Sequence, residues 1–116
     1  MKRDMDLVRS ILLKLEQKDI GRSVTIDGFE DETVSRHLEL LEEAGLIKAT
    51  IIPLDNRPSL VLVERPTWQG YDFLDAIRSD QVWNRTKTLV AEKTGSTAFE
   101  VIKAVATAIA TKLLLG

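Results

Sequence analysis

The chain has 116 residues, of which 44% are hydrophobic and 29% charged, a composition typical of a single globular domain with a hydrophobic core. It contains no cysteine and one histidine, which excludes disulfides, thiolate metal sites and multi-histidine metal centres. No apolar run approaches the roughly 18 to 20 residues that cross a bilayer, and the charged N-terminus is unlike a signal peptide, so we expect a cytoplasmic protein with no membrane partner.

The first predicted element is a helix over residues 4–18. Its apolar stripe recurs with helical spacing and consists of Leu7, Val8, Ile11, Leu12 and Leu15. Asp4 or Asp6 can cap its N-terminal end. Residues 23–26 (SVTI) favour a short strand, and the Asp-Gly pair directly after them is a turn signal.

The second predicted helix covers residues 31–44 and is the central feature of the sequence. Its apolar face recurs at helical intervals and comprises Val34, His37, Leu38, Leu41 and Ala44. Asp31 can cap the first turn, and Gly45 can adopt the left-handed conformation that ends a helix. We expect the single histidine, His37, to be a partly buried structural residue rather than a ligand, because metal sites need several such side chains. Residues 26–31 leave room for at most one further helical turn.

Two β-rich runs follow, over residues 46–52 and 59–64, and turn-forming residues separate them. This pattern predicts a β-hairpin with its tip near residues 54–58 and with Arg57 exposed on it. A helix that runs directly into such a hairpin is typical of a winged helix-turn-helix, in which the hairpin is the wing.

Three more helices are predicted, over residues 67–79, 80–93 and 97–115, with a break at residues 94–96. Thr67 is the expected cap of the first of them. The large aromatic side chains in this region could form a stacking platform, but in a small domain we expect them in the core. They are Trp68, Tyr71, Phe73 and Trp83.

The last predicted helix is unusually apolar, and we expect it to pack against the first helix and partly against a second copy of the protein. The residues proposed for this homodimer interface are Phe99, Ile102, Val105, Ala106, Ile109 and Leu113. Packing within one monomer only is an equally open alternative.

Several stretches of the sequence resemble the domain of unknown function 2513 family. They are MKRDMDLVRSILLKLE, HLELLEEAGLI, TWQGYDFLDAIRSDQVWN and FEVIKAVA, and together they span nearly the whole chain. The resemblance implies a small bacterial or phage-associated protein with an α+β, mainly helical fold. Together with the predicted elements, this winged-helix-like fold leads us to predict a single domain, with a winged helix-turn-helix core over residues 1–66 and a helical C-terminal extension over residues 67–116 that packs on the same core. The resemblance also implies a weak association with transcriptional regulators, and it brings no established activity.

Candidate nucleic-acid-binding residues lie on the outward side of the second helix and on the hairpin. They are Thr33, Ser35, Arg36, Lys48 and Arg57. The charge pattern opposes this interpretation, because residues 21–45 contain seven acidic and two basic side chains, and phosphate contacts need lysine and arginine. The alternative is that the acidic helix face is a solvated part of the scaffold.

Two functions therefore remain in view. The first is a DNA-binding, transcription-regulator-like protein whose partner is double-stranded DNA. The second is a winged-helix protein-interaction module that does not bind DNA, suggested by the acidic helix face and the shortened connection before it. The sequence shows no catalytic arrangement and no phosphate-binding loop, so we expect no enzyme activity, no cofactor and no small-molecule ligand.

Overall fold

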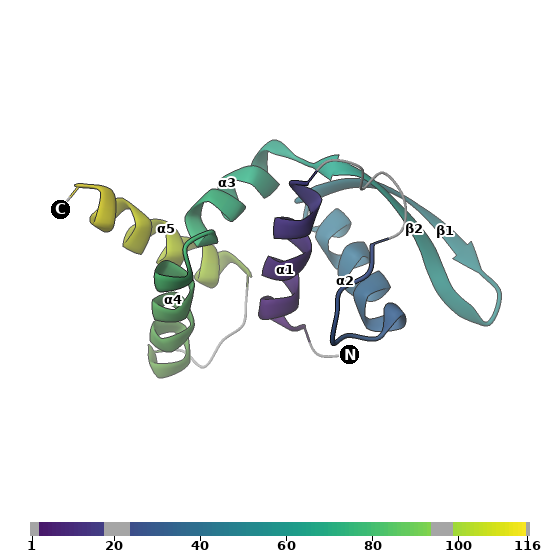
Figure 1. The fold of residues 1–116 in the computed structure, drawn as a ribbon, viewed down its shortest axis with the longest axis horizontal. Helices are drawn as coiled ribbons and strands as arrows, with labels where there is room; N and C mark the ends of the chain where they lie inside the picture. The colour runs from purple at the N-terminus through teal and green to yellow at the C-terminus, as the bar shows by residue number, and fades with distance from the viewer. Residues whose placement is uncertain (1–2, 18–23, 94–98, 116) are drawn as a thin grey trace. The chain divides into compact units, whose positions relative to one another are not determined.

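The computed structural model describes residues 3–17, 24–93 and 99–115 and shows an α+β, mainly helical fold (Figure 1). Within these residues the elements follow the order α1, α2, β1, β2, α3, α4 and α5, an arrangement compatible with a winged-helix-like fold. The chain forms two compact units, Met1–Tyr71 and Asp72–Gly116. The first unit holds α1, α2, the β-hairpin and the start of α3, and the second unit holds the rest.

Helix α1 covers Met5–Leu15. Asp4 is its cap, because its Oδ1 atom accepts the N–H groups of Asp6 and Leu7 at 3.0 and 3.1 Å. The predicted end at residue 18 is wrong for the described residues 16 and 17, which are not helical. The N–H of Gln17 instead bonds to the carbonyl of Lys14, a tighter i to i+3 contact that ends the α-helical ladder.

The described part of the connection from α1 to α2 contains a turn and no helix. The predicted strand is wrong for residues 24–26, because the sheet in the described chain has two strands and neither pairs with them. Ser23 lies outside the described residues. The predicted turn is confirmed, since Phe29 donates to the carbonyl of Ile26 at 3.2 Å and Gly28 has a φ of 88°.

Helix α2 covers Asp31–Glu43. The prediction that Asp31 caps it is wrong: Glu30 occupies the cap position, without a side-chain bond, and Asp31 is the first helical residue. The predicted stop is confirmed, because Gly45 has a φ of 77°. The N–H groups of Gly45 and Leu46 bond to the carbonyls of Glu42 and Leu41, which is the Schellman arrangement of a helix C-terminus.

The predicted hairpin is confirmed, and its strands are longer than expected. Strands β1 (Ile47–Leu54) and β2 (Arg57–Pro66) pair antiparallel around a two-residue turn, in which Asn56 has a φ of 54°. Alternate side chains of the hairpin are buried in the core of the first unit, against α1 and α2. The buried hairpin residues are Ile47, Val61, Val63 and Pro66.

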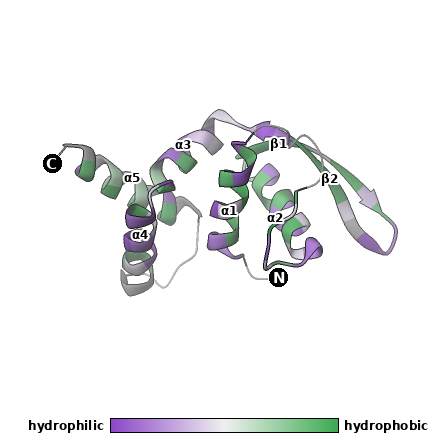
Figure 2. Cartoon of the chain, in the orientation of Figure 1, coloured by the Kyte–Doolittle hydropathy of each residue, from purple (hydrophilic) through white to green (hydrophobic). Residues whose placement is uncertain are grey.

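Hydrophobic residues of the hairpin also occupy its outward face. These exposed side chains are Ile52, Leu54, Leu60 and Leu62. Ile52 lies opposite Leu60 in the register, so the two form a cross-strand apolar pair in contact with solvent. Figure 2 shows how apolar residues recur along both strands, whereas α1 and α2 carry apolar and polar residues on different sides.

Helix α3 covers Trp68–Ile77, and the predicted cap Thr67 is confirmed, since its hydroxyl accepts the N–H of Gly70 at 3.1 Å. The same hydroxyl donates to the carbonyl of Gly45 at 2.5 Å, and the Thr67 N–H donates to the carbonyl of Leu46 at 2.9 Å. These bonds join the start of α3 to the end of α2.

The prediction that all four large aromatic side chains are in the core is wrong for two of them. Phe73 and Trp83 are buried, but Trp68 is 78% exposed and Tyr71 is also exposed. The reason is a tertiary contact: Gly70, which has no side chain, is the residue of this turn that packs against Leu46 and Pro66. Trp68 and Tyr71 are three residues apart and therefore share a different side of the helix.

Helices α4 (Asp80–Lys93) and α5 (Phe99–Leu115) pack against each other in the second unit. The described buried residues of this pair are Val82, Trp83, Thr86, Val90, Ile102 and Ala106. Thr86 satisfies its buried hydroxyl by donating to the carbonyl of Val82 at 2.7 Å. The predicted break at residues 94–96 lies outside the described residues.

Candidate functional site

The outward side of α2 and the first residues of β2 together line a small polar pocket of about 110 Å³. Its lining residues are Ser35, Arg36, Glu39, Arg57 and Ser59, and we call it the arginine pocket. Three of the five predicted nucleic-acid-binding residues, Ser35, Arg36 and Arg57, therefore meet in one place although up to 22 positions separate them in the sequence. The fold of the first unit brings them together because β2 packs against α2.

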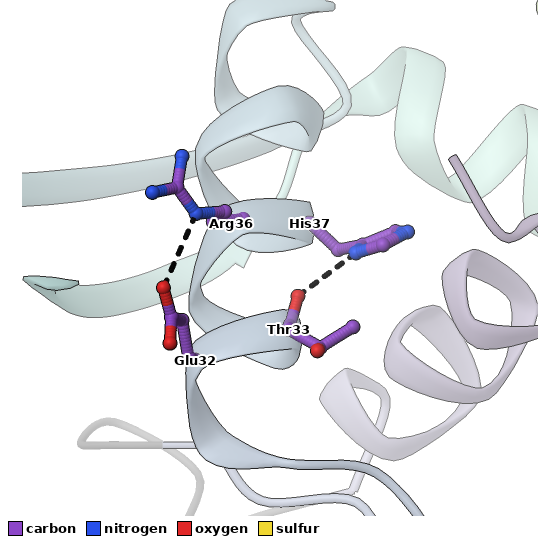
Figure 3. A network of polar contacts seen from close by, with 4 residues as sticks. All are labelled: Glu32, Thr33, Arg36 and His37. Atoms are coloured by element: carbon purple, nitrogen blue, oxygen red, sulfur yellow. Dashed lines mark hydrogen bonds and ion pairs between the residues drawn. The ribbon is translucent and has the colours of Figure 1, made fainter. Parts of the chain in front are cut away.

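Arg36 reaches the pocket from α2 and also contacts a carboxylate on its own helix. Its Nε atom lies 3.7 Å from Oε1 of Glu32, one turn earlier, and both side chains are more than half exposed. An exposed pair of this kind contributes little stability, so the guanidinium can exchange this partner for another anion. Figure 3 shows the two terminal nitrogens of Arg36 directed away from Glu32.

Arg57 reaches the pocket from the hairpin, directly after the turn. It is exposed and forms no ion pair with any residue in the described ranges. Its position follows from the tight turn, which places it opposite Leu54 at the end of the strand ladder. The pocket thus combines two guanidinium groups with two hydroxyls and one carboxylate, that of Glu39.

The other two predicted binding residues do not line the pocket. Lys48 lies opposite Arg65 in the hairpin register, near the end remote from the turn, and its Nζ atom is 3.6 Å from Oε2 of Glu64. The carbonyl of Thr33 accepts a hydrogen bond from His37. Figure 3 shows that Thr33 and His37 lie on a different side of α2 from Glu32 and Arg36.

His37 has the structural role that the sequence predicts, with complete rather than partial burial. Its Nδ1 atom donates to the carbonyl of Thr33 at 2.8 Å, and its Nε2 atom accepts the N–H of Asp4 at 2.9 Å. These partners require the neutral ring with the proton on Nδ1. Both ring nitrogens are occupied by backbone groups, so His37 is not available as a ligand or a base.

The residues predicted for a dimer interface differ in how exposed their side chains are on α5. Ile102 and Ala106 are buried, Val105 and Ile109 are half-buried, and Leu113 is 52% exposed. The side chain of Phe99 lies outside the described residues. Among the described members of this set, Val105, Ile109 and Leu113 are therefore the ones that a second molecule could contact, and the dimer itself stays a prediction.

Sequence reasoning did not select two residues of the pocket, Glu39 and Ser59. Ser59 is two positions after Arg57 in a strand, so the period-two rule places it on the same face and could have identified it. Glu39 is four positions after Ser35, so helical spacing puts it on the same side of α2, but its position beside Arg57 in the pocket depends on how the hairpin packs. The described ranges contain no group of three or more His, Asp or Glu side chains arranged to hold a metal ion. No helix in those ranges is long and apolar enough to span a bilayer.

Comparisons with known proteins agree with the resemblance seen in the sequence. The model of a family described as "Hypothetical protein (DUF2513)" matches residues 2–96. A protein of Haemophilus influenzae named "Uncharacterized protein" is 44% identical over 118 residues, which covers 98% of this chain and 99% of that relative. No solved structure matches the chain. The chain therefore belongs to the DUF2513 family.

Proposed function

We propose that this protein is a DNA-binding protein of the transcription-regulator type, and that the arginine pocket receives a phosphate of the DNA backbone. The observation that carries the proposal is the meeting of Arg36 from α2 and Arg57 from the hairpin around one pocket that also offers the hydroxyls of Ser35 and Ser59. Helix and hairpin are the two elements that a winged-helix protein lays against a duplex.

The chemistry of the pocket suits a phosphate group. Guanidinium groups form paired, charge-assisted hydrogen bonds with phosphate oxygens, and serine hydroxyls add neutral ones. Such contacts fix the position of a protein on the duplex without reading its sequence. Arg36 and Ser35 lie in the first half of α2, so that end of the helix is the part nearest to the bound backbone.

The acidic residues of α2 limit the affinity. Glu32 already contacts Arg36, Glu39 lines the pocket, and Glu42 and Glu43 follow along the helix. Carboxylates near phosphates repel them, so we expect weak binding that declines steeply with salt. The proposal therefore assigns the phosphate contact to the junction of helix and hairpin rather than to the whole length of α2.

The test is fluorescence anisotropy with a labelled duplex of mixed sequence, titrated at about 50 mM and about 200 mM salt. We expect measurable binding at the lower salt, strong weakening at the higher salt, and a loss of about tenfold or more in affinity for Arg57→Ala, within the range for one charge-assisted contact. Arg85→Ala is the matched control, because it removes the same charge from the second unit. No binding by the unaltered protein at the lower salt, or equal losses in both variants, would overturn the proposal.

A second candidate function is a protein-interaction module that does not bind DNA. The observation that favours it is the exposed apolar face of the hairpin, which contains Ile52, Leu60 and Leu62. A hairpin face that contacts phosphates needs cations, and these three side chains are apolar. If the protein is such a module, Arg36→Ala and Arg57→Ala leave binding to its protein partner unchanged, whereas Leu62→Asp abolishes that binding. The anisotropy titration separates the two functions, because this alternative expects no salt-sensitive DNA binding.

A further inference from the structure

The second unit contains a larger groove that the proposed DNA contact does not use. Its volume is about 360 Å³, and it lies between α4 and α5. Its lining residues are Gln81, Arg85 and Leu89 from α4, and Ala108, Ile109, Lys112 and Leu113 from α5. The α4 residues recur every four positions and the α5 residues belong to two consecutive turns, so each helix contributes one continuous side. We call it the α4–α5 groove.

The floor of this groove is an apolar stripe that α4 covers only in part. Ile102 and Ala106 of α5 are buried, Ile109 is half-buried, and Leu113, at the same helical phase, is 52% exposed. The apolar stripe of α5 therefore becomes progressively more exposed toward the C-terminal turns of this helix. Leu89, from α4, supplies apolar surface on the opposite side.

The described charged residues of the groove are both cations. Arg85 and Lys112 line it together with the uncharged Gln81, and no carboxylate is among the lining residues that the structure describes. Neither cation forms an ion pair with another residue in the described part of the chain. An apolar floor beside two cations without a carboxylate partner complements a molecule that is apolar over most of its surface and anionic at one end.

The same charges disfavour a second copy of the chain as the occupant. A two-fold contact places the same surface patch on both sides of the interface. Lys112 and Arg85 would then face the same cations of the partner, and like charges across an interface oppose association. The described charged side chains of α5 are Lys103 and Lys112, and both are cations.

We propose that the α4–α5 groove binds an amphipathic anion, with an apolar chain against Leu89, Ile109 and Leu113 and a carboxylate or phosphate group between Arg85 and Lys112. Its volume is near the lower end of the roughly 300 to 1,000 Å³ that small-molecule sites occupy, so one short chain fills it. The same chemistry occurs in a free fatty acid and in the headgroup region of an anionic lipid. This inference does not depend on DNA binding, because all of its residues are in the second unit.

The test is a calorimetric titration of the full chain with sodium decanoate below its micellar concentration. Decanol, which has the chain without the charge, and acetate, which has the charge without the chain, are the matched ligands. We expect saturable binding of decanoate, at least tenfold weaker binding of decanol, and none of acetate. Equal binding of decanoate and decanol would overturn the proposal.

Variants connect the binding to these residues. We expect Arg85→Gln combined with Lys112→Gln to weaken decanoate binding at least tenfold, and Arg57→Ala in the first unit to leave it unchanged. Leu113→Ser tests the apolar floor and should also weaken binding. All three altered groove residues are exposed, so thermal unfolding should remain close to that of the unaltered protein. Unchanged binding by the double variant would contradict the assignment.

Two further measurements identify the source of the anion. Flotation with vesicles of phosphatidylglycerol, compared with phosphatidylcholine, supports a lipid headgroup if the double glutamine variant loses the binding, and decanoate binding without flotation supports a free acid. Sedimentation velocity at micromolar concentration tests whether a second copy of the chain covers the groove. A dimer that decanoate does not dissociate and that Leu113→Ser disrupts would show that a second copy covers the groove, and would overturn the proposal.

Discussion

His37 links two helices of the first unit through both ring nitrogens. One nitrogen binds a carbonyl in its own helix, and the other accepts the N–H of Asp4, 33 positions earlier at the cap of α1. The helical phase of the residue indicates that it faces inward, but the phase contains no information about a partner so distant in sequence. The bond to Asp4 exists because α1 and α2 pack together, and packing is a tertiary property.

We predict that His37→Leu lowers the stability of the first unit by about 1 to 3 kcal/mol, because the N–H of Asp4 then loses its acceptor while partly buried. The measurement is urea unfolding followed by circular dichroism. His37→Gln is the control, since its amide oxygen can still accept a hydrogen bond, and it should lose less. Equal urea midpoints for the leucine variant and the unaltered protein would show that the hydrogen bond between His37 and Asp4 does not contribute to stability.

At the scale of elements, the junction of α2, β1 and α3 shows how closely separate segments can approach. A Cβ atom built on Gly70 would lie 2.0 Å from the carbonyl oxygen of Leu46 and 3.3 Å from Cβ of Pro66. The contact at Leu46 is with backbone, which cannot rotate away as a side chain can. Thr67 holds the same junction through its bonds to Gly45 and Leu46.

We predict that Gly70→Ala destabilises the protein by about 1 to 3 kcal/mol through this overpacking. Helix propensity alone predicts the opposite sign, a gain of about 1 kcal/mol for alanine over glycine within a helix. Thermal unfolding decides between them. Gln69→Ala, at the exposed neighbouring position, serves as the control for substitution in the same turn. A higher melting temperature for Gly70→Ala would show that the junction can relax.

At the scale of the whole molecule, the distribution of charge matters more for the proposed binding of anions than the net charge does. The net charge is −2, yet the arginine pocket and the α4–α5 groove each contain two cations. The arginine pocket also contains Glu39, whereas the described lining of the groove has no carboxylate. The two sites therefore differ in how strongly a nearby carboxylate opposes an anionic ligand.

We predict that Glu39→Gln strengthens DNA binding roughly two- to fivefold at low salt, because removing one half-buried charge near a phosphate changes the interaction by about 0.5 to 1 kcal/mol. Anisotropy at about 50 mM salt measures the change, and the difference should shrink at about 200 mM. Glu43→Gln, on the same helix but outside the pocket lining, should have a smaller effect. Weaker DNA binding by Glu39→Gln would contradict the phosphate assignment.

Local patterns in the sequence determined the elements that depend on neighbouring residues. The helical phase of α2, the left-handed stop at Gly45, the hairpin and the cap at Thr67 all follow from rules that act within about five residues. The same rules failed where two local solutions compete: Asp31 has the chemistry of a cap, yet Glu30 occupies that position. Residues 24–26 have strand propensity, but a strand forms only where a partner strand pairs with it.

Only the tertiary structure decided which faces of the helices and strands contact one another. It placed Arg57 beside Arg36, left Trp68 exposed because Gly70 makes the close contact, and opened a groove where α4 ceases to cover α5. Each outcome depends on contacts between residues far apart in the chain, and hydrophobic periodicity shows that a face is apolar without showing what covers it. For this reason the sequence alone determined the elements and the family resemblance, and the packing decided where binding can occur.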